Sequence, residues 1–509
     1  MSYDLSIPAQ LMQALVPDLA LMAGAMVLML VAAWRDDSEE HQRLVGIASI
    51  GVIVATMVLV FWFAGRDLSS GPGPIAVDGF RWAADLIFLT GALATIALSL
   101  DYNGREGILA AESHVLVLFA TSGMMILAAA RDLMIVFLGI EILSIAVYVL
   151  AGLNRRSGRA AEAALKYFLL GAFSTGFLLY GIALVYGATG STSLPVIGAR
   201  IQDFVLYRQP MLMVGVGLLL VGFAFKVAVA PFHMWAPDVY EGAPTPITAY
   251  MAAAVKAAAF AAFLRVWIEA FRQLGPSWVA PIWWMAAITM VLGNVVALSQ
   301  RNVKRMLAYS SIVHSGYLLV AVAAGTRLGA AAFLFYLFAY TLATFGSFAV
   351  VAAIGQPGER QLGIVDYEGL WSIRPGLAVA MAVYMLALLG FPVFGGVGFF
   401  AKWYLLQAAL NSPNGLVSLA VLLVLTSVVS AGYYLHLVRV MFMKPRPDDA
   451  AAPPPLGAFT RAVVMATAVL ILALGLMPGK LAQWTMQHPP TPARAAANRM
   501  QEQTADAVR

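Results

Sequence analysis

The sequence predicts an all-α, polytopic membrane protein, and three observations support that prediction. First, 61% of the 509 residues are hydrophobic and only 11% are charged, whereas a soluble domain carries roughly 25% charged residues. Second, apolar stretches recur along the whole chain, and about fourteen of them are long enough to cross a bilayer, which takes about 20 residues. Third, single ionisable residues interrupt several of these stretches.

In chain order, the expected spans are 11–34, 44–64, 82–100, 111–130, 133–153, 162–187, 211–230, 245–270, 278–299, 304–325, 329–354, 376–409, 416–443 and 459–478. The segment before the first span lacks the basic start and cleavage site of a signal peptide, so we expect this span to remain. Two spans contain helix-breaking residues. One is interrupted near Pro231, and the long 376–409 stretch is interrupted near Pro392, which lies among glycines.

The two interrupted spans are the seventh and the twelfth, so a five-helix unit would repeat in opposite senses across the membrane. We expect three N-terminal spans in residues 1–110, one five-helix unit in 111–270 and a second in 277–445. Residues 446–509 would hold the last span and a solvated tail from Pro489, and 444–455 would be a flexible, proline-rich loop. The loops after odd-numbered spans are richer in Lys and Arg than the loops after even-numbered spans. Because basic loops usually stay in the cytoplasm, we expect the odd-numbered loops there and both termini outside.

Several classes of site are excluded by composition and motif. Cysteine is absent, so the chain has no disulfide and no thiolate ligands for an iron–sulfur cluster. None of the six histidines pairs with another at i, i+4, and there is neither a P-loop nor a strand–GxGxxG–helix unit. The net charge of +5 reflects the loops of a membrane protein rather than nucleic-acid binding. We therefore expect no cofactor or metal on this chain, and an energy source in a gradient or a partner.

Ionisable residues inside apolar stretches are the main candidates for function, because a charge at the centre of a membrane helix costs about 2.5–3.5 kcal/mol on insertion scales. The most central are Glu141, Lys226, Lys256 and Lys402. A structural alternative is a hydrogen-bonded glutamate between helices, or lysines that extend to the membrane surface. The central positions favour proton carriers, because a mobile carboxylate would alternately stabilise and release the charge of a buried lysine.

Three further residues could take part in proton transfer. His233 lies beside the first break and His314 lies in AYSSIVHSGY; histidine suits a proton relay, although a lone histidine on an apolar helix is usually structural. Lys166 begins its span near a basic loop, so function and extension to the surface are equally consistent with its position. A structural or loop position is expected for Asp85, His114, His436, Asp238 and Glu241.

One long segment resembles a known family. The run PFHMWAPDVYEGAPTPITAYMAAAVKAAAF at 231–260 resembles the signature of the antiporter-like subunits of respiratory complex I, which are related to multisubunit cation/proton antiporters. ALKYFLLGAFSTGFLLYG at 164–181 and NVKRMLAYSSIVHSGYLL at 302–319 match as well. The insert at 237–242 is more similar to the N-type subunit than to the L and M types. The resemblance implies two inverted five-helix units, spans 4–8 and 9–13, each with a broken helix.

The resemblance also assigns residues. The family's fifth-span glutamate corresponds to Glu141, its seventh-span lysine to Lys226 and its eighth-span lysine to Lys256. Its twelfth-span charge corresponds to Lys402, where the M type typically has glutamate. The family commonly has His-Met-Gly-Tyr where this chain has His-Ser-Gly-Tyr from His314 onward, so the histidine is kept and its neighbour differs.

What the resemblance implies is a non-redox subunit of a bacterial, proton-translocating NADH:quinone oxidoreductase in the inner membrane. Its expected partners are other membrane-arm subunits, among them another antiporter-like subunit and small membrane subunits, together with lipid. NADH, FMN, iron–sulfur clusters and quinone would be bound by partner subunits and not by this chain. Two alternatives stay open: a subunit of a multisubunit Na+/H+ antiporter, and a passive scaffold that has lost pumping.

Overall fold

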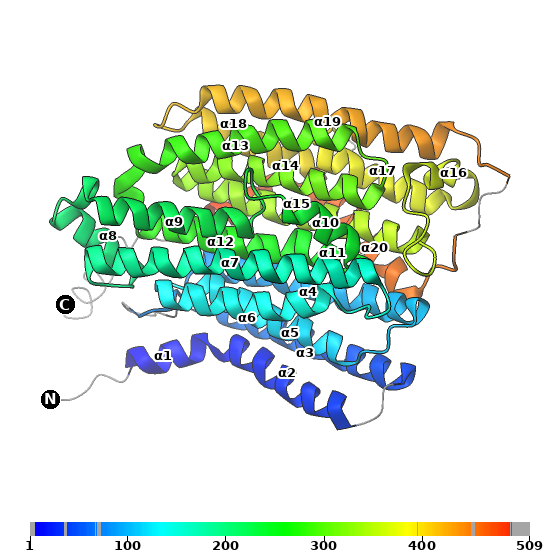
Figure 1. Cartoon of the computed structure of the whole chain (residues 1–509), viewed down its shortest axis with the longest axis horizontal. Coiled ribbons are helices and arrows are strands. Elements are labelled where there is room, and N and C mark those ends of the chain that lie inside the picture. The colour runs from blue at the N-terminus through cyan, green and yellow to red at the C-terminus, as the bar shows by residue number, and fades with distance from the viewer. Residues whose placement is uncertain are drawn as a thin grey trace.

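The computed structural model describes residues 6–34, 38–66, 68, 73–393, 395–448, 453–488 and 490. In these ranges, twelve helices are long and apolar enough to cross a membrane. Of the two remaining predicted spans, 211–230 holds the shorter helix Pro210–Lys226, and 376–409 holds the two helices Pro375–Leu389 and Val397–Leu410. All fourteen expected spans are therefore helical. Figure 1 shows these helices side by side along the long axis of the molecule. The predicted all-α membrane fold is therefore confirmed.

The helices follow the predicted order. The N-terminal part contains α1 (Ser6–Ala14), α2 (Val16–Trp34), α3 (Glu39–Ala64) and α4 (Gly79–Glu106). The next part contains α5 (Glu112–Ala129), α6 (Leu133–Ala151), α7 (Gly158–Thr189), α9 (Pro210–Lys226), α10 (Trp235–Gly242), α11 (Thr245–Tyr250) and α12 (Lys256–Glu269). The third contains α13 (Gly275–Leu298), α14 (Val303–Ala324), α15 (Arg327–Ile354), α17 (Pro375–Leu389), α18 (Val397–Leu410) and α19 (Val417–Met443). The last long helix is α20 (Ala458–Leu476).

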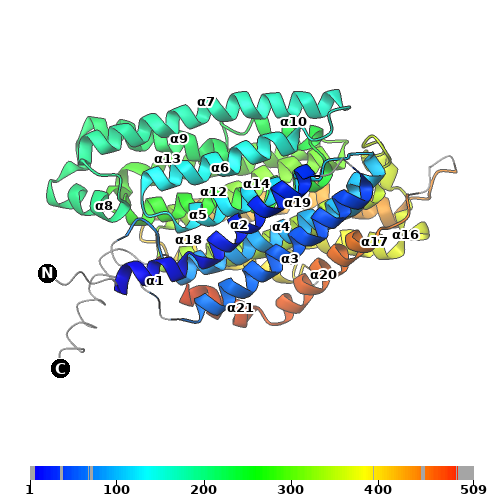
Figure 2. The same ribbon diagram turned by 90° about the horizontal axis from the view of Figure 1, so that it is seen from below.

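The sequence does not predict four of the short helices: α8 (Leu194–Asp203), α10, α16 (Leu370–Ile373) and α21 (Pro478–Gln487). Figure 2 shows α1, α8 and α21 toward one end of the bundle and α16 toward the other. The tail predicted from Pro489 lies outside the described residues apart from residue 490, and the predicted 444–455 loop is described only in part.

Side-chain caps explain where several long helices begin and end. The carboxylate of Asp132 accepts a hydrogen bond from Met134 N at the start of α6, and Asn302 accepts one from Arg305 N at the start of α14. Such caps satisfy backbone donors that the first helical turn leaves free. At the other end, Gly190 closes α7 in the left-handed conformation, which glycine adopts without steric cost.

Two isolated bridges relate the halves of the molecule. Asp132 pairs with Ser193 at the start of the fifth span, and Asn302 pairs with Gly363 at the start of the tenth. Each bridge joins the start of a span to the chain that follows the next span. The fifth and tenth spans run in opposite directions because successive spans alternate. Equivalent bridges five spans apart therefore agree with two inverted five-helix units.

Both predicted breaks are present, but the first begins earlier than expected. The helix α9 ends at Lys226, so the expectation that this lysine lies in the middle of a helix reaching residue 230 is wrong. The reason is that neighbouring helices bind the freed backbone. Thr289 accepts a hydrogen bond from Ala230 N at 2.9 Å, and Ser315 donates one to Val227 O at 2.7 Å. Backbone inside a membrane needs such partners wherever a helix is interrupted.

The second break separates α17 from α18. The helix α17 ends at Leu389, and Gly390 follows in the left-handed conformation with φ 74°. The carbonyl of Leu389, freed by the break, accepts a hydrogen bond from the Nζ atom of Lys402 at 2.9 Å. A charged side chain therefore binds backbone at the second break.

The burial of the spans differs strongly. The α11–α12 span is fully buried, and α14 and α15 are almost fully buried. The helices α2, α3, α7 and α20 bury only about a third of their residues or less. The centre of the molecule is thus formed by α11–α12, α14 and α15, and the ionisable residues on these helices are the ones best shielded from the surroundings.

Candidate functional site

The helix α14 connects the first break to the centre of the molecule. On one side Ser315 binds the backbone of the first break at Val227. One turn earlier, Ser311 accepts hydrogen bonds from the Nζ atom of Lys256, at 2.9 Å on its carbonyl and at a shorter distance on its hydroxyl. Residues four apart on a helix share a face. One polar face of α14 therefore contacts both the backbone next to Lys226 and the side chain of Lys256.

Lys226 lies against α6. Its Nζ atom donates to Ser144 Oγ at 2.8 Å and to the Tyr148 hydroxyl at 3.3 Å, and it lies 5.6 Å from the centre of the Tyr148 ring. Only 8% of Lys226 is exposed. The ammonium group therefore has neutral oxygen partners and an aromatic face, a setting that favours a buried cation.

Glu141 lies one turn before Ser144 on α6. It is close enough to Lys226 to interact electrostatically, but no direct ion pair between them is formed in the described chain. The glutamate is half-buried, and the exposed Leu138 and Ile145 lie beside it on the outer face of α6. The predicted pair is therefore in place as neighbours, and the carboxylate lies at the edge of the molecule.

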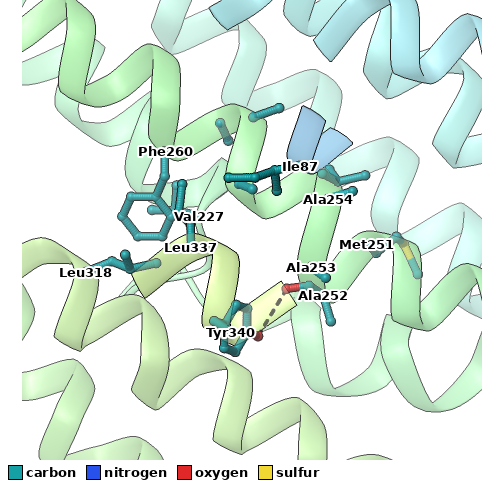
Figure 3. Packing of buried hydrophobic residues seen from close by; sticks show 14 of the residues in the cluster. Ile87, Val227, Met251, Ala252, Ala253, Ala254, Phe260, Leu318, Leu337 and Tyr340 are labelled. Carbon is teal, nitrogen blue, oxygen red and sulfur yellow. Dashed lines mark hydrogen bonds between the residues drawn. The ribbon is translucent and has the colours of Figure 1, made fainter. Parts of the chain in front are cut away.

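Lys256 follows a local change of helix type. A π-helical turn spans Met251–Val255, and α12 begins at the lysine. Figure 3 shows the Tyr340 hydroxyl pointing at the Ala252 carbonyl of this turn, with a hydrogen bond of 3.1 Å. π-helical turns inside α-helices occur frequently at functional sites. Lys256 is 1% exposed, so its ammonium group is held in the apolar centre by Ser311.

His314 lies between two of the lysines. Its Nδ1 atom is 2.6 Å from the Tyr336 hydroxyl, and its Nε2 atom is 3.2 Å from the Tyr434 hydroxyl. Both Lys256 and Lys402 are close enough to act on it electrostatically. A histidine with a hydroxyl on each ring nitrogen can take a proton on one side and give one up on the other.

Lys402 completes the series on α18. Besides its bond to Leu389 O, its Nζ atom donates to Ser427 Oγ at 3.1 Å and lies 4.7 Å from the centre of the Tyr317 ring. A small cavity between Lys402 and His314 has about 10 Å³ open to the centre of a water molecule. That volume is close to the minimum for one water. The cavity therefore has room for one water beside both the histidine and the lysine.

We call Glu141, Lys226, Lys256, His314 and Lys402 the charge row. Glu141 and Lys226 are neighbours at α6, and Lys256, His314 and Lys402 are neighbours around α14, which also binds the backbone next to Lys226 through Ser315. The lysines of the charge row are bound by hydroxyl and carbonyl groups, which stabilise an ammonium group less than a carboxylate does. Such lysines can lose a proton without leaving a partner charge unpaired.

Lys166 lies outside the charge row. Its side chain is 41% exposed and pairs with Glu162 at 2.7 Å and with Asp238 at 2.9 Å. Arg305 binds the same Asp238 at 3.0 Å and also Glu241 at 2.7 Å. Asp238 and Glu241 belong to α10, so their expected position in a loop is wrong, because the chain after the first break forms a short helix.

His233 is the other predicted residue outside the charge row. It lies in the turn between α9 and α10, where it is half-buried. Its Nδ1 atom has no hydrogen-bond partner among the described residues. The structure therefore places His233 beside the first break without linking it to the lysines.

The partners of the charge row are not identified from the sequence. Ser144 and Ser311 carry a weak signal, because each lies three residues from a candidate, Glu141 or His314, in an otherwise apolar helix. Tyr336, Tyr434 and Ser427 carry none, since they come from spans far along the chain and only the packing of helices brings them to the lysines and the histidine.

Comparison with known proteins identifies the family. Residues 130–430 match the family model described as NADH:quinone oxidoreductase/Mrp antiporter, TM. NADH-quinone oxidoreductase subunit N from Gemmatimonas aurantiaca is 51% identical over 486 residues, which cover 92% of this chain and 91% of that protein. The chain belongs to the subunit N family of NADH-quinone oxidoreductases. Subunit N from Trichlorobacter lovleyi, 43% identical over 93% of this chain and 95% of that protein, agrees.

Solved structures share the fold of this subunit N family member. A chain of respiratory complex I from Thermus thermophilus, solved with bound aureothin, superposes with a TM-score of 0.78 at 38% identity, covering 92% of this chain and 99% of that one. A chain of the Mrp complex from Dietzia sp. DQ12-45-1b superposes with a TM-score of 0.80 at 21% identity, covering 94% and 96%. The second likeness shows a common fold alone.

Proposed function

We propose that this chain is a proton-translocating, non-redox subunit in the membrane arm of a bacterial NADH:quinone oxidoreductase, located in the inner membrane. The observation that carries the proposal is the charge row, in which three buried lysines have neutral partners and His314 lies within electrostatic reach of Lys256 and Lys402. The helix α14 contributes His314, binds Lys256 through Ser311 and binds the backbone next to Lys226 through Ser315. Buried ionisable groups in a membrane protein bear a desolvation cost, which function can explain. The names of the relatives support the assignment to the complex.

Glu141 would control the charge on Lys226. Two unit charges 4 Å apart interact with about 4 kcal/mol at an effective dielectric constant of about 20. Movement of the Glu141 carboxylate toward Lys226 therefore favours the ammonium form, and movement away favours release of the proton. Ser144 and Tyr148 keep the Nζ atom in place during both states.

The released proton would pass along α14. Lys256 is bound by Ser311, and His314 lies one turn further on the same helix. From His314 a water in the small cavity would reach Lys402, whose neighbour Ser427 leads to the Tyr317 hydroxyl at 3.3 Å. Ordered water would have to connect Lys226 to Lys256 and Lys256 to His314, because none of these pairs shares a hydrogen bond among the described residues.

The energy would come from partner subunits. NADH, FMN, iron–sulfur clusters and quinone would be bound by those subunits, and quinone reduction there would move the Glu141 carboxylate. The outer face of α6 fits this dependence, because Glu141 lies half-buried beside exposed Leu138, Ile145 and Val149. A neighbouring membrane-arm subunit packed on this face would touch the carboxylate, while other exposed apolar faces would meet lipid or small membrane subunits.

The competing assignment is a subunit of a multisubunit Na+/H+ antiporter. The Mrp likeness favours it at the level of fold. The 51% identity to a subunit N favours the oxidoreductase instead. A passive scaffold is less well supported, because a scaffold gains nothing from buried lysines that are costly to desolvate.

Co-purification tests the assignment to the complex. The chain, tagged at its C-terminus, is purified from gently solubilised membranes, and its partners and NADH:quinone reductase activity are measured. We expect an active dehydrogenase to co-purify. Recovery with small membrane subunits and no NADH oxidation would favour the antiporter assignment instead.

The first mutational prediction concerns the controlling pair. Glu141→Ala and Lys226→Ala should each depress proton pumping and the electron transfer coupled to it, because each removes one member of the pair. Glu112→Ala, at an exposed glutamate on α5, is the matched control and should leave both rates unchanged. Near-normal pumping by both variants, with an intact complex, would remove these residues from the path.

A further inference from the structure

A second group of buried charges lies where α2 packs near α4. Arg81 on α4 donates a short hydrogen bond to Asp18 on α2. One turn later on α4, the Oδ2 atom of Asp85 lies 3.6 Å from Arg81 Nε. The side chains of Arg81 and Asp85 have no exposed surface, and that of Asp18 has 4%. Two carboxylates thus share one guanidinium group away from solvent.

The neighbouring charges are already balanced. Arg265 donates two hydrogen bonds to Asp78, at 2.8 and 2.9 Å, and one to Glu269 at 2.9 Å. Arg131 binds the other oxygen of Glu269 at 2.9 Å. This neighbouring group therefore holds two arginines and two carboxylates, each in a close ion pair. It leaves no spare positive charge for Asp85.

Asp85 is the carboxylate without hydrogen bonds. The guanidinium of Arg81 donates to the backbone carbonyls of Ala76 and Ala14 and to Asp18, while its Nε atom makes no hydrogen bond. Both oxygens of Asp85 lack a hydrogen-bond partner among the described residues. Burying an ionised carboxylate with no donors costs far more than burying a neutral acid.

The charged groups that face Asp85 do not change this balance. They are Arg81, Asp18, Asp78 and Arg265, and Arg265 is committed to Asp78. In the described part of the chain, no three histidine, aspartate or glutamate side chains converge as a metal site would require. The ligand that neutralises the excess negative charge is then a proton.

We propose that Asp85 binds a proton at neutral pH and stands as a neutral carboxylic acid beside the ionised Arg81–Asp18 pair. This proton-binding site is separate from the charge row and does not depend on the proposed function. The sequence favours a structural role for Asp85, and the proposal assigns it proton binding instead. The sequence alone does not show that Arg81 is already bound by Asp18 from another helix.

Infrared difference spectroscopy tests the proposal on the full chain, purified from its membranes with its natural partners. At neutral pH we expect the carbonyl band of a protonated carboxylic acid, shifted by exchange into D₂O. The band should be lost in Asp85→Asn and retained in the control variant Glu112→Gln, which changes an exposed carboxylate on α5. A spectrum of Asp85→Asn that keeps every such band would overturn the proposal.

Accumulation in the membrane gives a second readout. Asparagine resembles the neutral acid. The Asp85→Asn protein should therefore reach the same amount in the membrane as the parent and have the same melting temperature. Asp18→Asn removes an ionised partner of Arg81 and should lower both. If Asp85→Asn protein accumulates less than Asp18→Asn protein, Asp85 is needed in its ionised form and the proposal is wrong.

Discussion

At the scale of residues, the buried lysines differ from the paired cations of the same molecule by the partners that hold them. Lys226, Lys256 and Lys402 bind hydroxyl and carbonyl oxygens. Lys304 instead makes a close ion pair with Glu359 at 2.5 Å. Removing a proton from a salt-bridged lysine leaves a buried carboxylate unpaired, which is costly. Under the proposed function, the neutral partners would leave the three lysines free to exchange protons.

Ser144→Ala tests this role of a neutral partner. The variant removes the 2.8 Å hydrogen bond to Lys226 Nζ, and hydrogen bonds to charged groups contribute about 1.5–3 kcal/mol. We expect proton translocation to slow by roughly tenfold or more, since about 1.4 kcal/mol corresponds to a factor of ten. Thr175→Val, which removes a hydroxyl bound only within α7, is the control. Equal translocation rates in the two variants would contradict the role given to Ser144.

At the scale of elements, one glutamate connects helices from the first three of the four predicted regions of the chain. Glu359, after α15, accepts hydrogen bonds from Tyr102 of α4, from the backbone and hydroxyl of Thr245 at the start of α11, and from Lys304 of α14. These elements come from the three regions that the sequence separates, 1–110, 111–270 and 277–445. The contact therefore holds the two five-helix units and the N-terminal helices at one end.

The stability of this junction should depend on pH. Burial raises the pKa of Glu359, but the Lys304 ammonium and the hydrogen bonds outweigh it and hold the pKa below the usual value. A carboxyl whose folded pKa is depressed stabilises the fold above its unfolded pKa of about 4.3, and this stabilisation is lost as the pH falls through the lower folded pKa. Glu359→Gln should therefore lower the melting temperature at pH 7 and flatten its decline in acid.

The control for that prediction is Glu368→Gln. Glu368 pairs with Lys444, whose side chain is 41% exposed, and exposed ion pairs contribute little. Thermal unfolding of the purified complex between pH 7 and pH 3 is the measurement. A Glu359→Gln protein that melts at the parent temperature at pH 7 would show that the junction does not hold the units together.

The elements themselves show what local sequence can and cannot predict. Length and apolar content predict the spans, and Pro231 and Pro392 with its glycines mark both breaks. The exact end of α9 at Lys226 depends on Thr289 and Ser315, which lie far along the chain and bind the freed backbone. The π-helical turn at Met251–Val255 is hidden in an alanine-rich run that would suit an ordinary helix equally well. The charged residues of the site can be predicted because each stands alone in an apolar stretch. Their tyrosine and serine partners can be identified only once the packing of the helices is known.

At the scale of the whole molecule, burial separates a shielded centre from a partly exposed margin. The α11–α12 span, α14 and α15 carry Lys256 and His314 in that centre, and α6 presents Glu141 at the margin. Under the proposed function, this position of the glutamate would let a neighbouring subunit act on Lys226 inside the chain. The predicted domain bounds and the orientation in the membrane stay predictions that experiment can address.

The absence of cysteine makes the orientation directly measurable. Single cysteines are introduced as Arg155→Cys, in the loop before α7, and Asn411→Cys, in the loop after α18; both positions are exposed. A maleimide that cannot cross the membrane should label residue 155 only from the cytoplasmic side and residue 411 only from outside. Labelling of both positions from the same side would contradict the alternating spans, and reversal of the two would place the termini in the cytoplasm.

The most direct test of proton transfer through the charge row is the number of protons pumped per NADH oxidised in vesicles that contain the purified complex. Lys256→Met removes the central carrier while keeping an apolar side chain of similar length. Lys480→Met changes an exposed lysine on α21 and serves as the control. We expect a lower ratio in Lys256→Met and the parent ratio in Lys480→Met. An unchanged ratio in Lys256→Met, in a fully assembled complex, would contradict it.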